Sequence, residues 1–123
     1  MPTRGIRGAT TVSTDTEKEV LAATSEMLKK ISASNPSLQP EDIASALFTV
    51  TADIHSTFPA KAAANIGWQD VPRTCAQEIP VDGGLQLCIR VLIHWNTDLK
   101  QDKIKHIYLK GAKVLRPDLI EEK

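Results

Sequence analysis

Residues 85–97, LQLCIRVLIHWNT, predict the central strand of the fold. The odd-numbered positions are all apolar and many are β-branched, as a strand packed on a core requires. These positions are Leu85, Leu87, Ile89, Val91, Ile93 and Trp95. The even-numbered positions form a mixed face with Arg90 near its middle. Because an unpaired buried guanidinium costs free energy, we expect an anion opposite Arg90, either a carboxylate of the protein or a ligand.

The composition narrows the class of protein. The chain has 123 residues, which fits one domain. Its 15 basic and 15 acidic side chains balance, which argues against nucleic acid or an anionic membrane surface as a partner. Its apolar stretches are shorter than the roughly 20 residues of a membrane-spanning helix. Two cysteines and no apolar leader favour a reducing compartment, so we expect a cytoplasmic protein.

The order of the predicted elements indicates an α+β fold, a mixed sheet with helices packed on one face. A Thr14–Glu17 capping box marks the start of the long helix. Because one long helix leaves the other face of the sheet partly bare, the pattern favours an oligomer. In chain order, the first half has a strand at 3–12, a helix from 13 or 14 to 32–35, a helical turn within 38–44 and a strand at 47–51. The second half has a short helix at 59–64, an extended segment at 71–79, the central strand, and a last strand at 105–115 that is interrupted at Gly111.

Several cations lie within or at the ends of these elements. They are Arg7, Lys61, Arg90 and Arg116. Two guanidiniums presented from neighbouring strands would bind a small molecule that bears carboxylates, because arginine holds a carboxylate with two parallel hydrogen bonds. The alternative is that each cation pairs with an acid of the protein, such as Glu78 or Asp53. Both interpretations stay open at this point.

Nucleophilic and metal chemistry find little support. Cys75 could act as a nucleophile with His94 or His106 as its base, but no glycine-rich turn, oxyanion loop or helix start accompanies it. The histidines, including His55, and the cysteines lack metal-ligand spacing, and no phosphate loop or dinucleotide fingerprint occurs. We therefore expect neither a metal nor a cofactor. Tyr108 fits simple packing, yet its hydroxyl could donate to a bound carboxylate.

Six short strings together resemble the monofunctional chorismate mutases of the AroH class. They occur in one order across nearly the whole chain: RGIRGATTV (4–12), FPAKA (58–62) followed by GWQ (67–69), VPRTCAQE (71–78), CIRV (88–91), HIYL (106–109) and VLRPDL (114–119). The resemblance implies a chorismate mutase domain at 1–119; the charged tail at 120–123 is expected to be mobile. It further implies a homotrimer built on a pseudo-α/β barrel, with active sites between adjacent subunits.

The implied reaction is the rearrangement of chorismate to prephenate, on the route to phenylalanine and tyrosine. This pericyclic step needs conformer selection and charge stabilisation, and no nucleophile or cofactor. Arg90 would bond to the ether oxygen, where negative charge grows, and to the side-chain carboxylate, which Arg7 and Tyr108 would also hold. Glu78, with Cys75, would bind the ring hydroxyl. The expected catalytic side chains are Arg7, Glu78 and Arg90; the pocket lining is Phe58, Thr74 and Leu115, with Lys61 and Arg116 near the ring carboxylate.

One position departs from the family pattern. Three residues after Lys61 the family often has an arginine, and this chain has Ala64. The loop before Gly67 is also one residue shorter. Arg73, where an apolar residue is expected, could replace the lost charge.

Two other interpretations compete with the enzyme. One is a non-catalytic trimeric carboxylate-binding module on the same scaffold, in which Arg7 and Arg90 only hold a ligand. The other is a trimeric enzyme with a related barrel, such as an imine deaminase of the Rid family. Glu78 discriminates among them, because a site for a hydroxylated ring uses it and a generic carboxylate binder does not.

Overall fold

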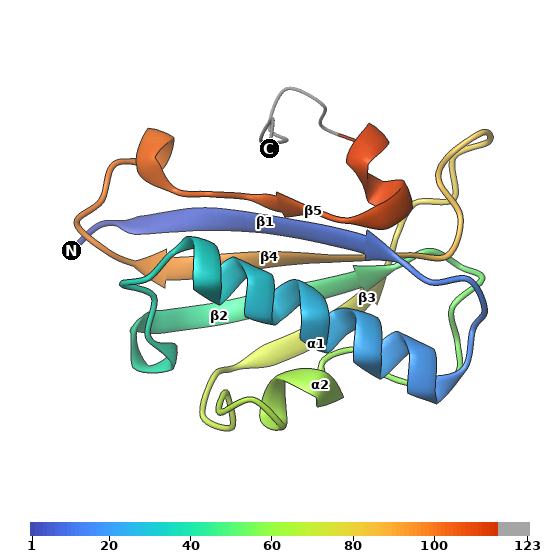
Figure 1. Ribbon diagram of the computed structural model, residues 1–123, viewed down its shortest axis with the longest axis horizontal. Coiled ribbons are helices and arrows are strands. Elements are labelled where there is room, and N and C mark those ends of the chain that lie inside the picture. Colours follow the sequence, from blue (N-terminus) through green and yellow to red (C-terminus); the bar gives the residue numbers. More distant parts are fainter. Residues whose placement is uncertain (116–123) are drawn as a thin grey trace.

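The computed structural model describes residues 1–115 of the chain. A five-stranded mixed sheet has the strand order β3-β2-β4-β1-β5 (Figure 1). The central strand β4 (Cys88–Asn96) is antiparallel to both of its neighbours, β1 (Thr3–Thr11) and β2 (Ile43–Val50). The edge strands β3 (Arg73–Gln77) and β5 (Ile107–Tyr108) run parallel to β2 and β1 respectively.

The predicted central strand is confirmed, with a later start. Its apolar face is buried through Ile89, Val91, Ile93 and Trp95. Leu85 and Leu87 do not continue the strand, because the backbone of Leu87 has a φ of +49°, which interrupts the extended conformation. The alternation of apolar residues therefore extends further along the sequence than the strand itself.

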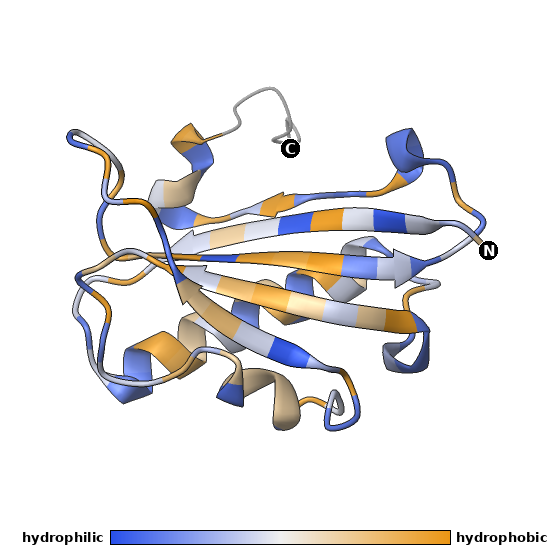
Figure 2. Cartoon of the chain, turned by 180° about the vertical axis from the view of Figure 1, so that it is seen from behind, coloured by the Kyte–Doolittle hydropathy of each residue, from blue (hydrophilic) through white to orange (hydrophobic). Residues whose placement is uncertain are grey.

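Both α-helices cover the same face of the sheet, as the sequence predicts (Figure 1). The long helix α1 (Glu17–Ser34) buries one stripe at helical spacing: Val20, Ala23, Thr24, Met27, Leu28 and Ile31. The short helix α2 (Lys61–Ala64) packs beside α1. Seen from behind, no helix of residues 1–115 lies across the opposite face of the sheet (Figure 2). Within residues 1–115 no helix has both the length and the apolar composition of a membrane span.

Helix α1 begins two residues later than the predicted capping box. Thr16 is the N-cap, and its hydroxyl accepts the N–H of Glu19 at 3.2 Å. The Glu19 carboxylate in turn accepts the hydroxyl protons of Ser13 and Thr14, at 2.9 and 2.5 Å. The predicted Thr14–Glu17 box is therefore wrong. The segment TDTEKE offers the Thr-x-x-Glu spacing twice, so local spacing alone does not decide between the two starts.

The predicted last strand is wrong beyond Tyr108. Residues 107–108 form β5, but the chain then turns into a 3-10 helix, η3 (Lys110–Val114). The backbone of Lys110 adopts a φ of +53°, and the N–H of Gly111 donates to Thr11 Oγ1 at 3.1 Å. Two further 3-10 turns are η1 (Pro40–Asp42), which matches the predicted helical turn, and η2 (Gln101–Lys103).

We expect Gly8→Ala to destabilise the fold by about 1–3 kcal/mol, because an added methyl group overfills the contact between β1 and α1. A Cβ at Gly8 would lie 2.7 Å from Ile31 Cδ1 and 3.1 Å from Val91 Cγ1. Urea unfolding measures the loss. The matched control is Gly5→Ala on the open face, where a Cβ meets only Leu92 Cδ1 at 3.6 Å. Equal unfolding free energies for the two variants would contradict this packing.

Candidate active site

The open face of the sheet carries a cavity of about 340 Å³, called here the sheet-face cavity. Strand register explains its position. Arg90 pairs with Ala9 on one side and with Thr49 on the other, and Ala9 pairs with Tyr108, so these side chains share a face. Gly8, one residue before Ala9, instead faces α1. The residues that line the cavity include Arg7, Leu47, Thr49, Arg90, Tyr108 and Leu115.

Arg90 has an acid beside it. Its Nε lies 3.3 Å from Oε2 of Glu78, and the Thr49 hydroxyl donates to the same carboxylate oxygen. Nε is buried and has no acceptor in hydrogen-bond geometry among residues 1–115, so the contact with Glu78 is electrostatic. The Arg90 side chain as a whole remains 43% exposed. The predicted anion is thus a protein carboxylate at Nε, while the rest of the guanidinium borders open space.

Arg90 also lines a second hollow. This loop cavity, of about 530 Å³, is bounded by Glu78, Arg90, Asp53 and the segment 79–86. Glu78 and Arg90 therefore meet between two cavities, and Glu78 lines only the second of them. A ligand that reaches both side chains would extend from one cavity toward the other.

Arg7 and Tyr108 are available for a ligand. Within the described part of the chain, no carboxylate pairs with the guanidinium of Arg7 and no group bonds to the hydroxyl of Tyr108. The backbone fixes both residues. The N–H of Arg7 donates to Nδ1 of His106 at 2.9 Å, and the N–H of Leu109 donates to the carbonyl of Ala9 at 2.9 Å. Two guanidiniums and a phenol consequently converge on one cavity, an arrangement suited to a carboxylate.

A second group of predicted site residues does not line this cavity. Phe58, Lys61, Thr74 and Cys75 line neither hollow. Phe58 is 68% exposed in the loop before α2. Thr74 is on the open face of edge strand β3, in register with Leu47, whereas Cys75 is in register with Phe48 and packs toward the helices. Within one chain, the structure therefore does not bring Cys75 to Glu78 as the resemblance implies.

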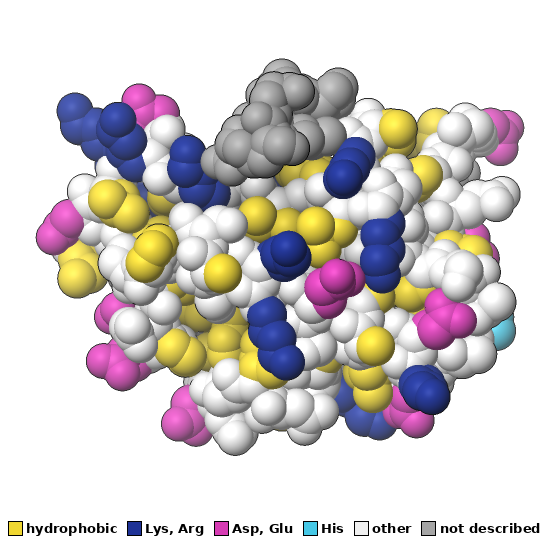
Figure 3. Space-filling model, viewed as in Figure 1, with side chains coloured by type: hydrophobic (Ala, Val, Ile, Leu, Met, Phe, Trp, Pro, Cys, Tyr) yellow, Lys and Arg dark blue, Asp and Glu magenta, His cyan; other side chains and the backbone are white. Residues whose placement is uncertain are grey.

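Lys61 is held by α1. Its Nζ lies 2.8 Å from Oε2 of Glu17, and the hydroxyl of Thr57 donates to the same oxygen at 3.0 Å. On the face seen in Figure 3, basic side chains lie scattered among acidic and apolar ones. Lys110 pairs with Glu26 in the same way, at 3.3 Å. The alternative in which a cation pairs with an acid of the protein thus holds for Lys61.

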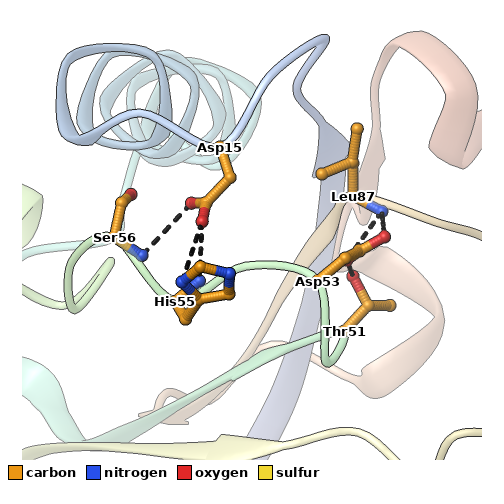
Figure 4. A network of polar contacts seen from close by, with 6 residues as sticks. All are labelled: Asp15, Thr51, Asp53, His55, Ser56 and Leu87. Carbon is orange, nitrogen blue, oxygen red and sulfur yellow. Dashed lines mark hydrogen bonds and ion pairs between the residues drawn. The ribbon is translucent and has the colours of Figure 1, made fainter.

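Asp15 fixes the loop that leads to Phe58. Its carboxylate accepts the backbone N–H groups of His55 and Ser56 at 3.0 and 3.2 Å (Figure 4). Hydrogen bonds from the Ser56 side chain and the His55 backbone lower the pKa of Asp15 below its ordinary 3.8. Lys61 and Thr57 likewise lower the pKa of Glu17 below 4.5. Two acids at the start of α1 therefore anchor the segment 55–61 in their charged forms.

Acid should loosen this anchor. A carboxylate whose pKa is lowered by folding contributes stability that is complete above its ordinary pKa and is lost as pH falls through the folded value. We therefore expect the Tm of the parent to decrease once the pH is lowered below about 4. The Asp15→Asn variant should have a lower Tm than the parent at neutral pH, and its Tm should decline less steeply in acid. Thermal melts across pH measure both, with exposed Asp70→Asn as the control. Parallel Tm profiles for Asp15→Asn and the parent would contradict the anchor.

Arg73 bonds to the loop that follows α2. Its Nη1 donates to the carbonyl of Trp68, and the N–H of Trp68 donates to the carbonyl of Ala63, the residue before Ala64. We expect Arg73→Val to raise KM with little change in kcat, since a charge that only captures substrate contributes equally to ground and transition states. Steady-state kinetics decide this, and an unchanged KM would reject a capture role.

The two cysteines differ in burial, Cys75 being half-buried and Cys88 buried. Cys75 and Cys88 are both free. Burial raises the pKa of the Cys88 thiol, which makes the thiolate scarcer. Among the described residues, no group of three His, Cys, Asp or Glu side chains is placed to hold a metal.

Six residues that line the sheet-face cavity are not among the predicted site residues: Gly8, Ala9, Leu47, Thr49, Val91 and Leu92. One predicted site residue lies outside the described part of the chain. Leu47 and Thr49 were assigned only to a strand, although their period-two spacing places both on the face that carries the cavity. Arg116 lies beyond the described residues. Leu115, at their end, lines the sheet-face cavity.

Comparison of the sequence and the fold with known proteins identifies the family of this chain. The sequence model of chorismate mutase type I matches residues 3–119, and the chain belongs to this family of isomerases. The class within it is AroH. The chain is 52% identical over 120 residues to chorismate mutase AroH of Bacillus subtilis (strain 168), covering 97% of this chain and 94% of that protein. It is 50% identical over 116 residues to chorismate mutase AroH of Thermus thermophilus, covering 94% and 95%.

A solved structure agrees. The chorismate mutase from Clostridium thermocellum superposes with a TM-score of 0.86 at 50% identity, covering 89% of this chain and 97% of that one. The predicted family and enzyme class are thus confirmed, and neither the binding-module nor the deaminase interpretation receives support.

Proposed function

We propose that this chorismate mutase rearranges chorismate to prephenate against the open face of the sheet, with Arg90 stabilising the reacting ether oxygen. The observation that carries the proposal is the convergence of Arg7, Arg90 and Tyr108 on the sheet-face cavity. The product then serves phenylalanine and tyrosine synthesis. Residues 1–119 form the chorismate mutase domain, in the cytoplasm, without metal, cofactor, membrane or nucleic acid.

Arg90 supplies the electrostatic part of catalysis. As the carbon–oxygen bond of the ether breaks, negative charge grows on the oxygen, and a fixed cation there lowers the transition state more than the ground state. Glu78 holds Nε from one side at 3.3 Å, which leaves the terminal nitrogens of the guanidinium for the substrate. Because the guanidinium of Arg90 is in position before the substrate binds, the site needs little reorganisation during the reaction.

The other side chains select the reactive conformer. The guanidinium of Arg7 and the hydroxyl of Tyr108, which bond to no other group within residues 1–115, hold the side-chain carboxylate beside Arg90. Glu78 accepts a hydrogen bond from the ring hydroxyl in the direction of the loop cavity. Fixing both ends of the molecule keeps the two reacting carbons together, which contributes through proximity.

The active site is completed by a second copy of the chain in a homotrimer. The support is that Phe58, Lys61, Thr74 and Cys75 do not line the cavity that holds Arg7 and Arg90, so that the expected site is not complete within one chain. Exposed apolar side chains support association, with Phe58 68% and Leu92 37% exposed. A neighbour would place its Phe58 half, with the ring-carboxylate contact of Lys61, over the open face.

The primary test is the loss of chorismate absorbance on adding the purified protein; no loss above the uncatalysed rate would refute the proposal. A second test addresses the assembly. Arg90→Lys and Lys61→Ala chains, each impaired at low substrate, are unfolded together and refolded. If sites lie between subunits, about one site in four regains both intact halves, and kcat/KM rises above either variant alone. Kinetics equal to the average of the separate variants would show that each site lies within one chain.

A further inference from the structure

The chain enters β4 through a strained residue. Leu87 has a φ of +49°, in the left-handed region that glycine occupies easily and a leucine does not. It stands one residue before β4 and three residues before Arg90. Its side chain packs against the core, so this conformation is part of the folded structure. Strain of this kind persists only where the surroundings enforce it.

Hydrogen bonds to the backbone of Leu87 provide that enforcement. The N–H of Leu87 lies 3.1 and 3.0 Å from the two carboxylate oxygens of Asp53 (Figure 4). Its carbonyl accepts the N–H of Val12 at 3.0 Å. The Thr51 hydroxyl donates to Asp53 at 2.5 Å and accepts the N–H of Cys88 at 2.9 Å. The side chains of Asp53 and Thr51 thus accept hydrogen bonds from the N–H groups of Leu87 and Cys88, the residue before β4 and its first residue.

The same end of β2 also fixes Glu78. The N–H of Glu78 donates to the carbonyl of Val50 at 2.8 Å, and the Thr49 hydroxyl donates to its carboxylate. The segment 49–53 therefore bonds both to Glu78 and to the backbone of Leu87 and Cys88, which precede Arg90 in the chain. A shift in this segment would change the position of the guanidinium relative to the acid beside it.

We propose that Asp53 is a positioning residue for the reaction, because its carboxylate holds Leu87 in the left-handed conformation and so fixes the place of Arg90 in the site. Asp53 does not line the sheet-face cavity. It does border the loop cavity together with Arg90, so its charge could act on the guanidinium through space instead. The inference rests on the role proposed for Arg90, and the experiment separates the two.

The experiment compares Asp53→Ala, Asp53→Asn, Leu87→Gly and the double variant Asp53→Ala/Leu87→Gly. We expect Asp53→Ala to lower kcat roughly tenfold to hundredfold with KM nearly unchanged, because a small displacement of a group that acts in the transition state has effects of this size. Asp53→Asn keeps one oxygen acceptor without the charge and should retain most of kcat. Asp98→Ala, an exposed acid beyond the other end of β4, is the charge-removal control.

Rescue distinguishes positioning from a direct effect of the charge. Glycine adopts a positive φ without strain, so Leu87→Gly alone should keep kcat within about twofold and should restore most of the loss in the double variant. Leu87→Asn, which also tolerates this conformation, repeats the test with a different side chain. Circular dichroism confirms folding of each variant.

The inference is overturned if Asp53→Ala keeps the parental kcat, if neither Leu87 substitution restores it, or if Asp53→Asn loses as much as Asp53→Ala. Failure of the proposed function looks different. In that case Arg90→Lys would itself retain activity, whatever Asp53 does.

Discussion

Replacing Arg90 by lysine is expected to lower kcat by about 10²–10³ while the fold is retained. The sheet-face cavity presents a planar guanidinium whose Nε is occupied by Glu78, 3.3 Å away. Lysine carries a single ammonium group on a flexible side chain. Unlike the planar guanidinium, this group cannot contact Glu78 and the substrate at the same time. Since the lost interaction develops in the transition state, kcat should fall more than KM rises.

The control for this substitution is Arg4→Lys on β1. Its Nε donates to the carbonyl of Leu99 at 3.1 Å, away from the cavity, so kcat should stay within about twofold of the parent. Chorismate consumption measures both variants, and circular dichroism checks their folding. Activity of Arg90→Lys within about tenfold of the parent would remove Arg90 from the mechanism.

Replacing Glu78 by glutamine is expected to lower kcat/KM by roughly 10²-fold. The amide oxygen still accepts the hydroxyl proton of Thr49, so the local packing survives. What disappears is the negative charge beside the Nε of Arg90, which we also propose as the acceptor of a hydrogen bond from the ring hydroxyl of the substrate. A hydrogen bond to a charged acceptor contributes more than one to a neutral acceptor, and its loss affects the hydroxylated substrate directly.

Glu26→Gln on α1 serves as the control, because it removes only a surface partner of Lys110 and should leave kcat/KM within about twofold of the parent. A dicarboxylic acid without a ring hydroxyl provides a second measurement. It should bind the parent and the Glu78→Gln protein with similar affinity. If kcat/KM survives the substitution, Glu78 does not contact the substrate.

Arg90 and Glu78 also show where sequence reasoning was incomplete. The even-numbered face of β4 indicated that Arg90 needs an anion, and both a protein acid and a ligand were open. In the folded chain the acid is Glu78, and Thr49 bonds to it from 29 positions away. Spacing along the chain does not reveal this contact, because β2 and β3 must first pair in parallel to bring Thr49 and Glu78 together.

The long elements were predictable because their patterns repeat. The apolar alternation of β4 and the helical stripe of α1 each extend over several periods, and burial follows them closely. The prediction of the last strand is wrong after Tyr108, because a contact with a residue far away in the sequence overrides the local pattern. Gly111 bonds to Thr11, 100 positions away, and the backbone at Lys110 turns to reach it.

The sequence alone predicted the central strand, the long helix, the placement of both helices on one face and, through six spaced strings, the family. It did so because periodicity and motif spacing are properties of neighbouring residues. The family resemblance already groups Arg7, Arg90 and Tyr108 around one carboxylate, but it took the tertiary structure to show that Phe58 and Lys61 of the same chain do not line the cavity that these three share. Strand order and register set those positions, and they depend on pairings between residues that are distant along the chain.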